Sequence, residues 1–113
     1  MNSDVPIIQK VYDFYRDFYG LIPQMPKQDR HTLGEEIQNT CLEFIKSLIY
    51  ASRTDKKNKF SYLEKAAMQL DLIKLLLRLA EDTKSIPTKR YLALSEQLQE
   101  IGKMLGGWIR SLN

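Results

Sequence analysis

The stretch MQLDLIKLLLRLA, residues 68–80, carries the densest apolar pattern in the chain and decides the fold. Starting at Leu70, apolar residues recur every three or four positions up to Ala80, which is the pattern of one buried helix face. A surface helix of a small domain needs only one such stripe. This helix has a second apolar side, which must be covered by the rest of the chain or by another copy of it. That second side consists of Met68, Leu72, Leu75, Leu76 and Leu79.

Two helices are predicted before this stretch. The first begins after Asp4, a residue able to cap a helix, and its apolar and aromatic stripe ends before Pro23. The second is predicted to be one continuous helix from about residue 26 to residues 51–53. Gly34 lies inside it and costs roughly 1 kcal/mol relative to alanine, so we expect a close helix contact there.

The third helix contains the apolar stretch at residues 68–80. It is predicted to begin at residues 60–62, with Ser61 and Glu64 forming a capping box, and to end at residues 82–84. The preceding residues 54–59, TDKKNK, have no apolar anchor and are predicted to form a polar turn.

A fourth helix is predicted from a Ser85 N-cap, with Pro87 in its first turn. It passes through Gly106 and Gly107, which together cost about 2 kcal/mol inside a helix. We therefore expect the backbone there to make a contact too close for a larger side chain. Its apolar residues keep an unbroken heptad spacing at Tyr91, Leu94, Leu98, Ile101, Leu105, Trp108 and Leu112.

These patterns together predict the fold class. No segment has the alternating period of a β-strand, and the connections between helices are short. Short connections place consecutive helices side by side in opposite directions. The sequence therefore predicts an all-α, antiparallel up-down-up-down four-helix bundle in a single domain, residues 1–113.

Composition and motifs argue against catalysis. His31 and Cys41 are the single histidine and the single cysteine, which excludes an intrachain disulfide and a cysteine-based metal site. Cys41 falls on the apolar stripe of the second helix, where a buried structural thiol is expected. We therefore predict no catalytic residue, metal or cofactor. No apolar run approaches the roughly 18 residues of a membrane span, and no signal peptide is visible, so a soluble cytoplasmic protein is expected.

The basic residues are the remaining candidates for binding, in a chain of formal net charge +3. Lys74 and Arg78 lie four positions apart and project from the same face of the third helix. For any single basic residue, a solvated helix face is an adequate explanation. A polyanion-binding surface requires several such residues on one face, and both interpretations stay open here. The candidates are Lys46, Arg53, Lys56, Lys57, Lys59, Lys74 and Arg78.

Three segments resemble one bacterial protein family. They are the run from Leu21 to Gly34, the LDLIKLLLRLA run of the third helix, and IGKMLGGWIRSL at residues 101–112. The family is that of the accessory variability determinants (Avd) of diversity-generating retroelements. It is closely related to four-helix-bundle proteins encoded in intervening sequences of bacterial 23S ribosomal RNA genes. The resemblance extends from about residue 7 to 112, and its LGGW-containing end is its most specific part.

The resemblance implies a ring-shaped homopentamer with a positively charged surface and no catalytic site of its own. Its implied partners are the retroelement reverse transcriptase and the template-repeat RNA, with which it supports mutagenic cDNA synthesis. The family's charged positions correspond to Lys74 and Arg78. The alternative is a bundle of the intervening-sequence type, whose role is unknown. A small enzyme or cofactor-binding bundle would need inward-facing carboxylate or histidine ligands, which the apolar stripes do not offer.

Overall fold

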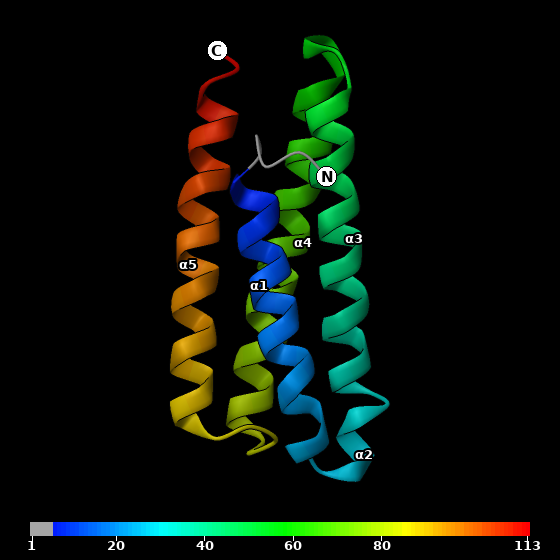
Figure 1. The fold of residues 1–113 in the computed structure, drawn as a ribbon, viewed down its shortest axis with the longest axis vertical. Helices are drawn as coiled ribbons and strands as arrows, with labels where there is room; N and C mark the ends of the chain where they lie inside the picture. Colours follow the sequence, from blue (N-terminus) through cyan, green and yellow to red (C-terminus); the bar gives the residue numbers. More distant parts are fainter. Residues whose placement is uncertain (1–5) are drawn as a thin grey trace.

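Four long helices make up the protein in a computed structural model that describes residues 6–113 (Figure 1). No strand occurs in this part of the chain, so the predicted all-α fold is confirmed. The long helices are α1 (Pro6–Leu21), α3 (Leu33–Arg53), α4 (Lys56–Asp82) and α5 (Thr88–Arg110). Two short helices, η1 (Ile22–Gln24) and α2 (Lys27–Arg30), connect α1 to α3.

Each long helix packs mainly against two others. α1 and α4 both contact α3 and α5, so α1 and α4 lie diagonally across the bundle, one in front and one behind in Figure 1. Connections occur at alternate ends of the long axis: residues 22–32 and 83–87 lie at the lower end, and residues 54–55 at the upper end. The resulting bundle is narrow, 44 Å long and 22 Å across.

The core is a column of apolar side chains from all four helices. Phe14 and Phe18 of α1 stack with ring centroids 6.4 Å apart, and Phe44 of α3 is fully buried beside this column. The predicted core face of α4 is confirmed, because its four apolar positions between Leu70 and Ala80 are all buried. The heptad stripe of α5 is buried in its central part and half-buried at Tyr91, Trp108 and Leu112. The buried residues of α4 and α5 are Leu63, Ala66, Leu70, Ile73, Leu77, Ala80, Leu94, Leu98, Ile101 and Leu105.

The predicted second helix is broken rather than continuous. α2 ends at Arg30 and α3 begins at Leu33. The Arg30 side chain bonds back to the chain before α2: Nε donates to the Met25 carbonyl (2.9 Å) and Nη2 to the Pro23 carbonyl (2.7 Å). These bonds hold the chain in a tight turn before α3. The expected close contact at Gly34 is confirmed, since a Cβ there would lie 3.3 Å from the Asp29 carbonyl oxygen and 3.3 Å from the Met25 sulfur.

The predicted start of the third helix is wrong. α4 begins at Lys56, and the polar turn shrinks to residues 54–55. Asp55 is the N-cap, and its carboxylate accepts a hydrogen bond from the backbone N–H of Asn58 (3.0 Å). One capping residue is enough to begin a helix in lysine-rich sequence, because lysine has a high helix propensity. Ser61 lies inside the helix and donates to the Asn58 carbonyl, so it forms no capping box.

The predicted Ser85 cap is also wrong. α5 begins at Thr88 with Pro87 in the capping position. Ser85 is buried and its hydroxyl donates to the carboxylate of Asp29, which ties the α4–α5 connection to α2. Lys84 adopts a left-handed backbone (φ 63°), as residues just beyond a helix end often do. The other predicted cap, Asp4, lies outside the described residues.

The expected tight contact at the paired glycines is absent from the described part of the chain. Among atoms other than the local helix backbone, the nearest to a Cβ at Gly106 or Gly107 belong to the guanidinium of Arg110, at 3.3 and 3.9 Å. That group is the flexible end of a side chain on the same helix. The expectation is wrong for the single chain because the neighbours Leu105 and Trp108 turn toward the core and the glycines do not.

Candidate partner and nucleic-acid interface

The side chains that could take part in catalysis or bind a metal do not cluster in the described part of the chain. Within residues 6–113, no group of three or more His, Cys, Asp or Glu side chains is placed to hold a metal ion. Cys41 is buried, and its desolvation raises the pKa of the thiol to about 12. The thiol is therefore protonated at neutral pH and is a poor nucleophile. His31, the single histidine, is exposed on the short connection after α2.

The second apolar side of α4 is exposed to solvent. Met68, Leu72, Leu75 and Leu79 follow a 4-3-4 spacing and form one line, here called the outer strip. Their residue exposures are 71, 40, 55 and 46%. The core residues of the same helix point into the bundle, so the outer strip lies on the opposite side. The prediction that this helix is apolar on two sides is confirmed, except at Leu76, which is half-buried against the core. A continuous exposed apolar line of this kind is a candidate interaction surface.

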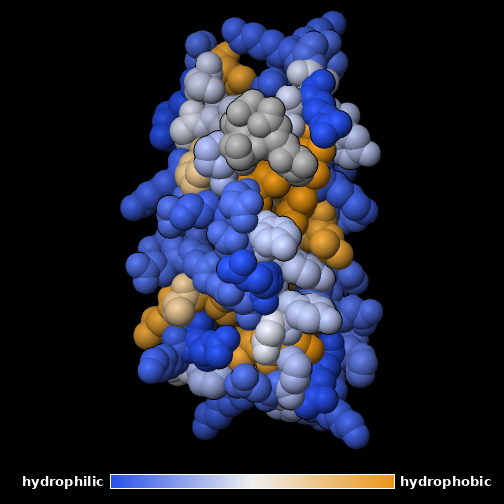
Figure 2. Space-filling model, in the orientation of Figure 1, coloured by the Kyte–Doolittle hydropathy of each residue, from blue (hydrophilic) through white to orange (hydrophobic). Residues whose placement is uncertain are grey.

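Figure 2 shows the opposite side of the molecule, on which α1 lies between α3 and α5. This side is largely hydrophilic, with hydrophobic side chains in separate patches between the helices. Its charges are compensated: Lys10 pairs with Glu100 of α5 (3.3 Å), and Arg16 pairs with Asp13 and Asp17 (both 3.7 Å).

Lys74 and Arg78 are placed together beside the outer strip. Both side chains are exposed, and both line a groove of about 260 Å³ between α4 and α5, across from Tyr91 and Ser95. The Nζ of Lys74 reaches over α5 and lies 3.3 Å from the position of a Cβ at Gly102. Among the described residues, neither cation has an ion-pair partner. The groove thus presents two uncompensated positive charges.

The remaining candidates are far from this groove. Lys46 lies on α3 and is paired with Glu43 at 3.1 Å. The other four lie around the α3–α4 connection, and eighteen residues of α4 separate Lys56 from Lys74, or roughly 27 Å of helix. We call residues 50–62 the hairpin tip. The structure therefore divides the candidates into the α4–α5 groove and the hairpin tip, which contains Arg53, Lys56, Lys57 and Lys59.

Aromatic residues at the hairpin tip were not identified from sequence. Tyr50 is 58% exposed and stacks on Tyr62, with ring centroids 5.4 Å apart and planes at 22°. Phe60 is 49% exposed. Lys59 lies with its Nζ 6.0 Å from the ring centroid of Trp108 on α5. The signal in the sequence is a basic cluster flanked by aromatic residues, with Tyr50 before it and Phe60 and Tyr62 after it, which apolar periodicity alone conceals.

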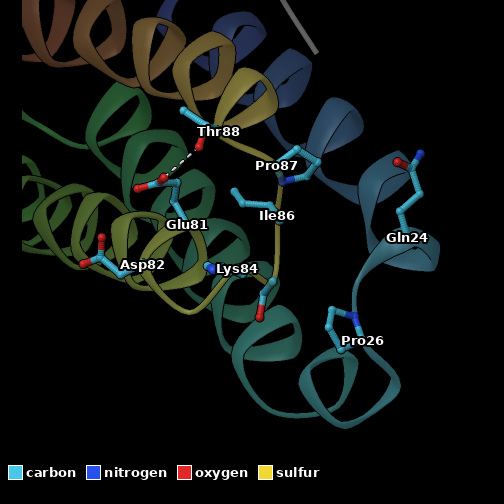
Figure 3. A pocket seen from close by; sticks show the side chains of 9 residues that line it. Gln24, Pro26, Glu81, Asp82, Lys84, Ile86, Pro87 and Thr88 are labelled. Carbon is cyan, nitrogen blue, oxygen red and sulfur yellow. Dashed lines mark hydrogen bonds between the residues drawn. The ribbon is translucent and has the colours of Figure 1, made fainter.

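A hollow of about 560 Å³ lies at the lower end of the bundle, between η1, the end of α4 and the start of α5 (Figure 3). Thr88 donates to Glu81 across it (2.9 Å), so these polar groups already satisfy each other. Its other charged groups, Asp82 and Lys84, are exposed to solvent. We assign this hollow no ligand.

One comparison with known proteins places the chain in a family. No helix in the described part of the chain is long and apolar enough to cross a bilayer. No curated protein sequence matches the chain significantly. The profile of the bAvd-like family matches residues 5–112, which is nearly the whole length. The chain therefore belongs to the bAvd-like family, which confirms its resemblance to the Avd family.

Proposed function

We propose that the protein is a non-enzymatic accessory subunit of a diversity-generating retroelement in the bacterial cytoplasm. It assembles as a homo-oligomer, a pentamer of antiparallel up-down-up-down bundles, and binds the reverse transcriptase and its template RNA during mutagenic cDNA synthesis. The family match over residues 5–112 carries this proposal, because it covers the whole bundle rather than one motif.

Assembly is supported by the outer strip of α4. Burying an exposed leucine or methionine side chain stabilises an interface by about 25 cal/mol per Å² of apolar surface. The strip extends over three helical turns, from Met68 to Leu79, which is long enough to pack against a helix of another copy. In this arrangement the second apolar side of α4 becomes a contact between subunits.

Partner binding is supported by the electrostatics of the α4–α5 groove. Lys74 and Arg78 have no anionic partner in the described chain, whereas the cations on the α1 side do. One pair of exposed charges contributes little in physiological salt. Repeated in every subunit, the same pair raises the local charge density that a polyanion or an acidic protein surface meets.

The test is the double variant Lys74→Ala with Arg78→Ala. We expect an intact oligomer, weaker binding of the cognate reverse transcriptase or of RNA, and less cDNA. Loss of two phosphate contacts lowers the slope of log affinity against log salt by about 1.4 for single-stranded RNA. The matched control is Lys10→Ala with Arg16→Ala, which removes the same charge from residues that are already ion-paired.

The proposal for Lys74 and Arg78 is contradicted if a correctly assembled double variant keeps its affinity for both partners across a salt series. The two residues would then belong to an ordinary solvated helix face. Genomic position gives an independent check. A neighbouring reverse transcriptase gene with a repeat pair supports the retroelement role, whereas a location within a ribosomal RNA gene contradicts it.

A further inference from the structure

We propose that the hairpin tip binds single-stranded nucleic acid, holding phosphates with Arg53, Lys56 and Lys57 and stacking bases on Tyr50 and Phe60. The inference rests on the proposed function, since it takes nucleic acid as a partner. It goes further by naming a separate surface and the form of the strand. In Figure 1 the α3–α4 connection stands at the upper end of the bundle, beyond the start of α1.

The four cations of the hairpin tip outnumber its single acidic residue, Asp55. Among the described residues, none of its four cations forms an ion pair. Asp55 is the single acidic residue between positions 50 and 62, and its carboxylate is occupied as the N-cap, accepting from the backbone and side chain of Asn58 at 3.0 and 2.9 Å. The local sequence therefore leaves a cationic surface open to an external anion.

The three lysines of the hairpin tip lie at the N-terminus of α4, where the helix dipole disfavours positive charge. The first turn of α4 contains Lys56, Lys57 and Lys59 and no acidic residue. Backbone N–H groups at a helix N-terminus carry a partial positive charge, so basic side chains there are repelled and anions are attracted. The Asp55 carboxylate at the N-cap is the single anion of the hairpin tip that offsets this repulsion, against three lysines. A bound phosphate would relieve it and would be attracted by the helix end as well as by the side chains.

The exposed rings of Tyr50 and Phe60 indicate which part of the ligand would lie beside the phosphate. Tyr50 is held in place by its stack on Tyr62, which leaves its other side available. Phe60 exposes about half of its surface one turn after the lysines. Aromatic side chains next to a basic surface stack with unpaired bases, and this stacking tolerates any sequence. The combination of exposed rings and unpaired cations is the chemistry of single-strand binding.

A duplex or an acidic protein segment fits this surface less well. In a duplex the bases are already stacked on one another, so its phosphates would use the lysines and leave the rings without a role. An acidic segment would neutralise the same lysines and would also leave Tyr50 and Phe60 exposed. A single strand supplies a negative charge and an unstacked planar ring in every nucleotide.

The experiment measures binding of a fluorescein-labelled 12-nucleotide oligouridylate by anisotropy, with a 12-base-pair RNA duplex and polyglutamate as competitors. We expect Tyr50→Ala and Phe60→Ala each to weaken binding by about 5- to 100-fold for a fully stacked base, an effect that persists at high salt. Lys56→Ala with Lys57→Ala should instead reduce the salt slope by about 1.4. Tyr12→Ala, at an exposed tyrosine of α1, is the matched control and should bind as the parent does. Emission of Trp108, the single tryptophan, should change on binding because Lys59 lies over its ring.

The outcomes separate this inference from the proposed function. If the tip variants bind like the parent while the Lys74 and Arg78 double variant loses RNA, the tip inference is overturned and the accessory role stands. If the parent protein binds neither RNA nor the reverse transcriptase, the proposed function itself fails. Competition by polyglutamate as strong as by the oligonucleotide, with no effect of Tyr50→Leu or Phe60→Leu, would make the tip an acidic-partner surface and overturn the inference. Circular dichroism and the leucine variants separate loss of stacking from loss of folding.

Discussion

Replacing Leu79 with glutamate tests whether the outer strip of α4 is covered in solution. Leu79 is 46% exposed in the single chain, so its outer half is available to another copy. Full burial of a leucine side chain is worth about 1.5–3 kcal/mol, so burial of this half stabilises an interface by roughly 1 kcal/mol. A glutamate there loses that contribution and must also be desolvated or protonated, which adds a further cost of at least about 1–3 kcal/mol. We expect the dissociation constant of the oligomer to rise by at least about 30-fold, since 1.4 kcal/mol corresponds to tenfold.

The assay is light scattering coupled to gel filtration over a dilution series. The parent protein should have a mass several times the 13.2 kDa of one chain, and Leu79→Glu should shift toward that single-chain mass at micromolar concentration. Tyr12→Glu is the matched control, because Tyr12 is similarly exposed but lies on α1, diagonally opposite α4. A parent protein that is monomeric at micromolar concentration would refute the reasoning, as would equal dissociation by both substitutions.

Three further predictions concern the bundle itself. Gly107→Ala should raise the free energy of unfolding by up to about 1 kcal/mol, because a Cβ there meets only the tip of Arg110; a lower melting temperature would show that another copy packs against this glycine. Asp55→Ala should cost about 1 kcal/mol by removing the N-cap of α4, measured by urea denaturation, and Asp55→Asn should recover most of it. The burial that raises the pKa of Cys41 from 9.0 to about 12 keeps its thiol neutral in the folded state, so its contribution to stability is complete below pH 9 and is lost as pH rises toward 12. The fall is at most about 1.4 kcal/mol per pH unit; Cys41→Ala should remove this component of the pH dependence, and identical profiles would contradict the assignment.

Apolar periodicity predicted the core of the bundle because it records directly which side of each helix avoids water. The buried and exposed sides of α4 were both readable from residues 68–80. The helix ends were not, because capping is decided by single hydrogen bonds with competing candidates. Asp55, and not the predicted Ser61, caps the N-terminus of α4. Ser85 donates a hydrogen bond to Asp29, which is 56 positions away in the sequence, and no local pattern reveals such a bond.

The candidate site was predicted only as a set of residues, because sequence spacing fixes the face of one helix and not its distance from another. Lys74 and Arg78 were correctly expected to share an exposed face. Their position across from Tyr91 and Ser95 depends on how α5 packs against α4. The expectation for Gly106 was wrong for the same reason. Sequence shows that a glycine lies within a helix, but not whether another helix packs against it or whether it faces open space.

The outer strip and the α4–α5 groove share Leu75, which is exposed in the strip and also lines the groove beside Lys74 and Arg78. Assembly through the strip would therefore bring the basic pair of each subunit near the next interface. Apolar burial favours that approach, whereas repulsion between repeated like charges opposes it. A polyanion bound along the grooves would remove the repulsion without disturbing the apolar contact, so it would bind the assembled form more tightly than the separate subunits. By linkage, the assembly would then be stabilised by the polyanion it binds. Under the proposed function, the leucines of α4 would bring subunits together, and its cations would make that association depend on nucleic acid or on an acidic partner.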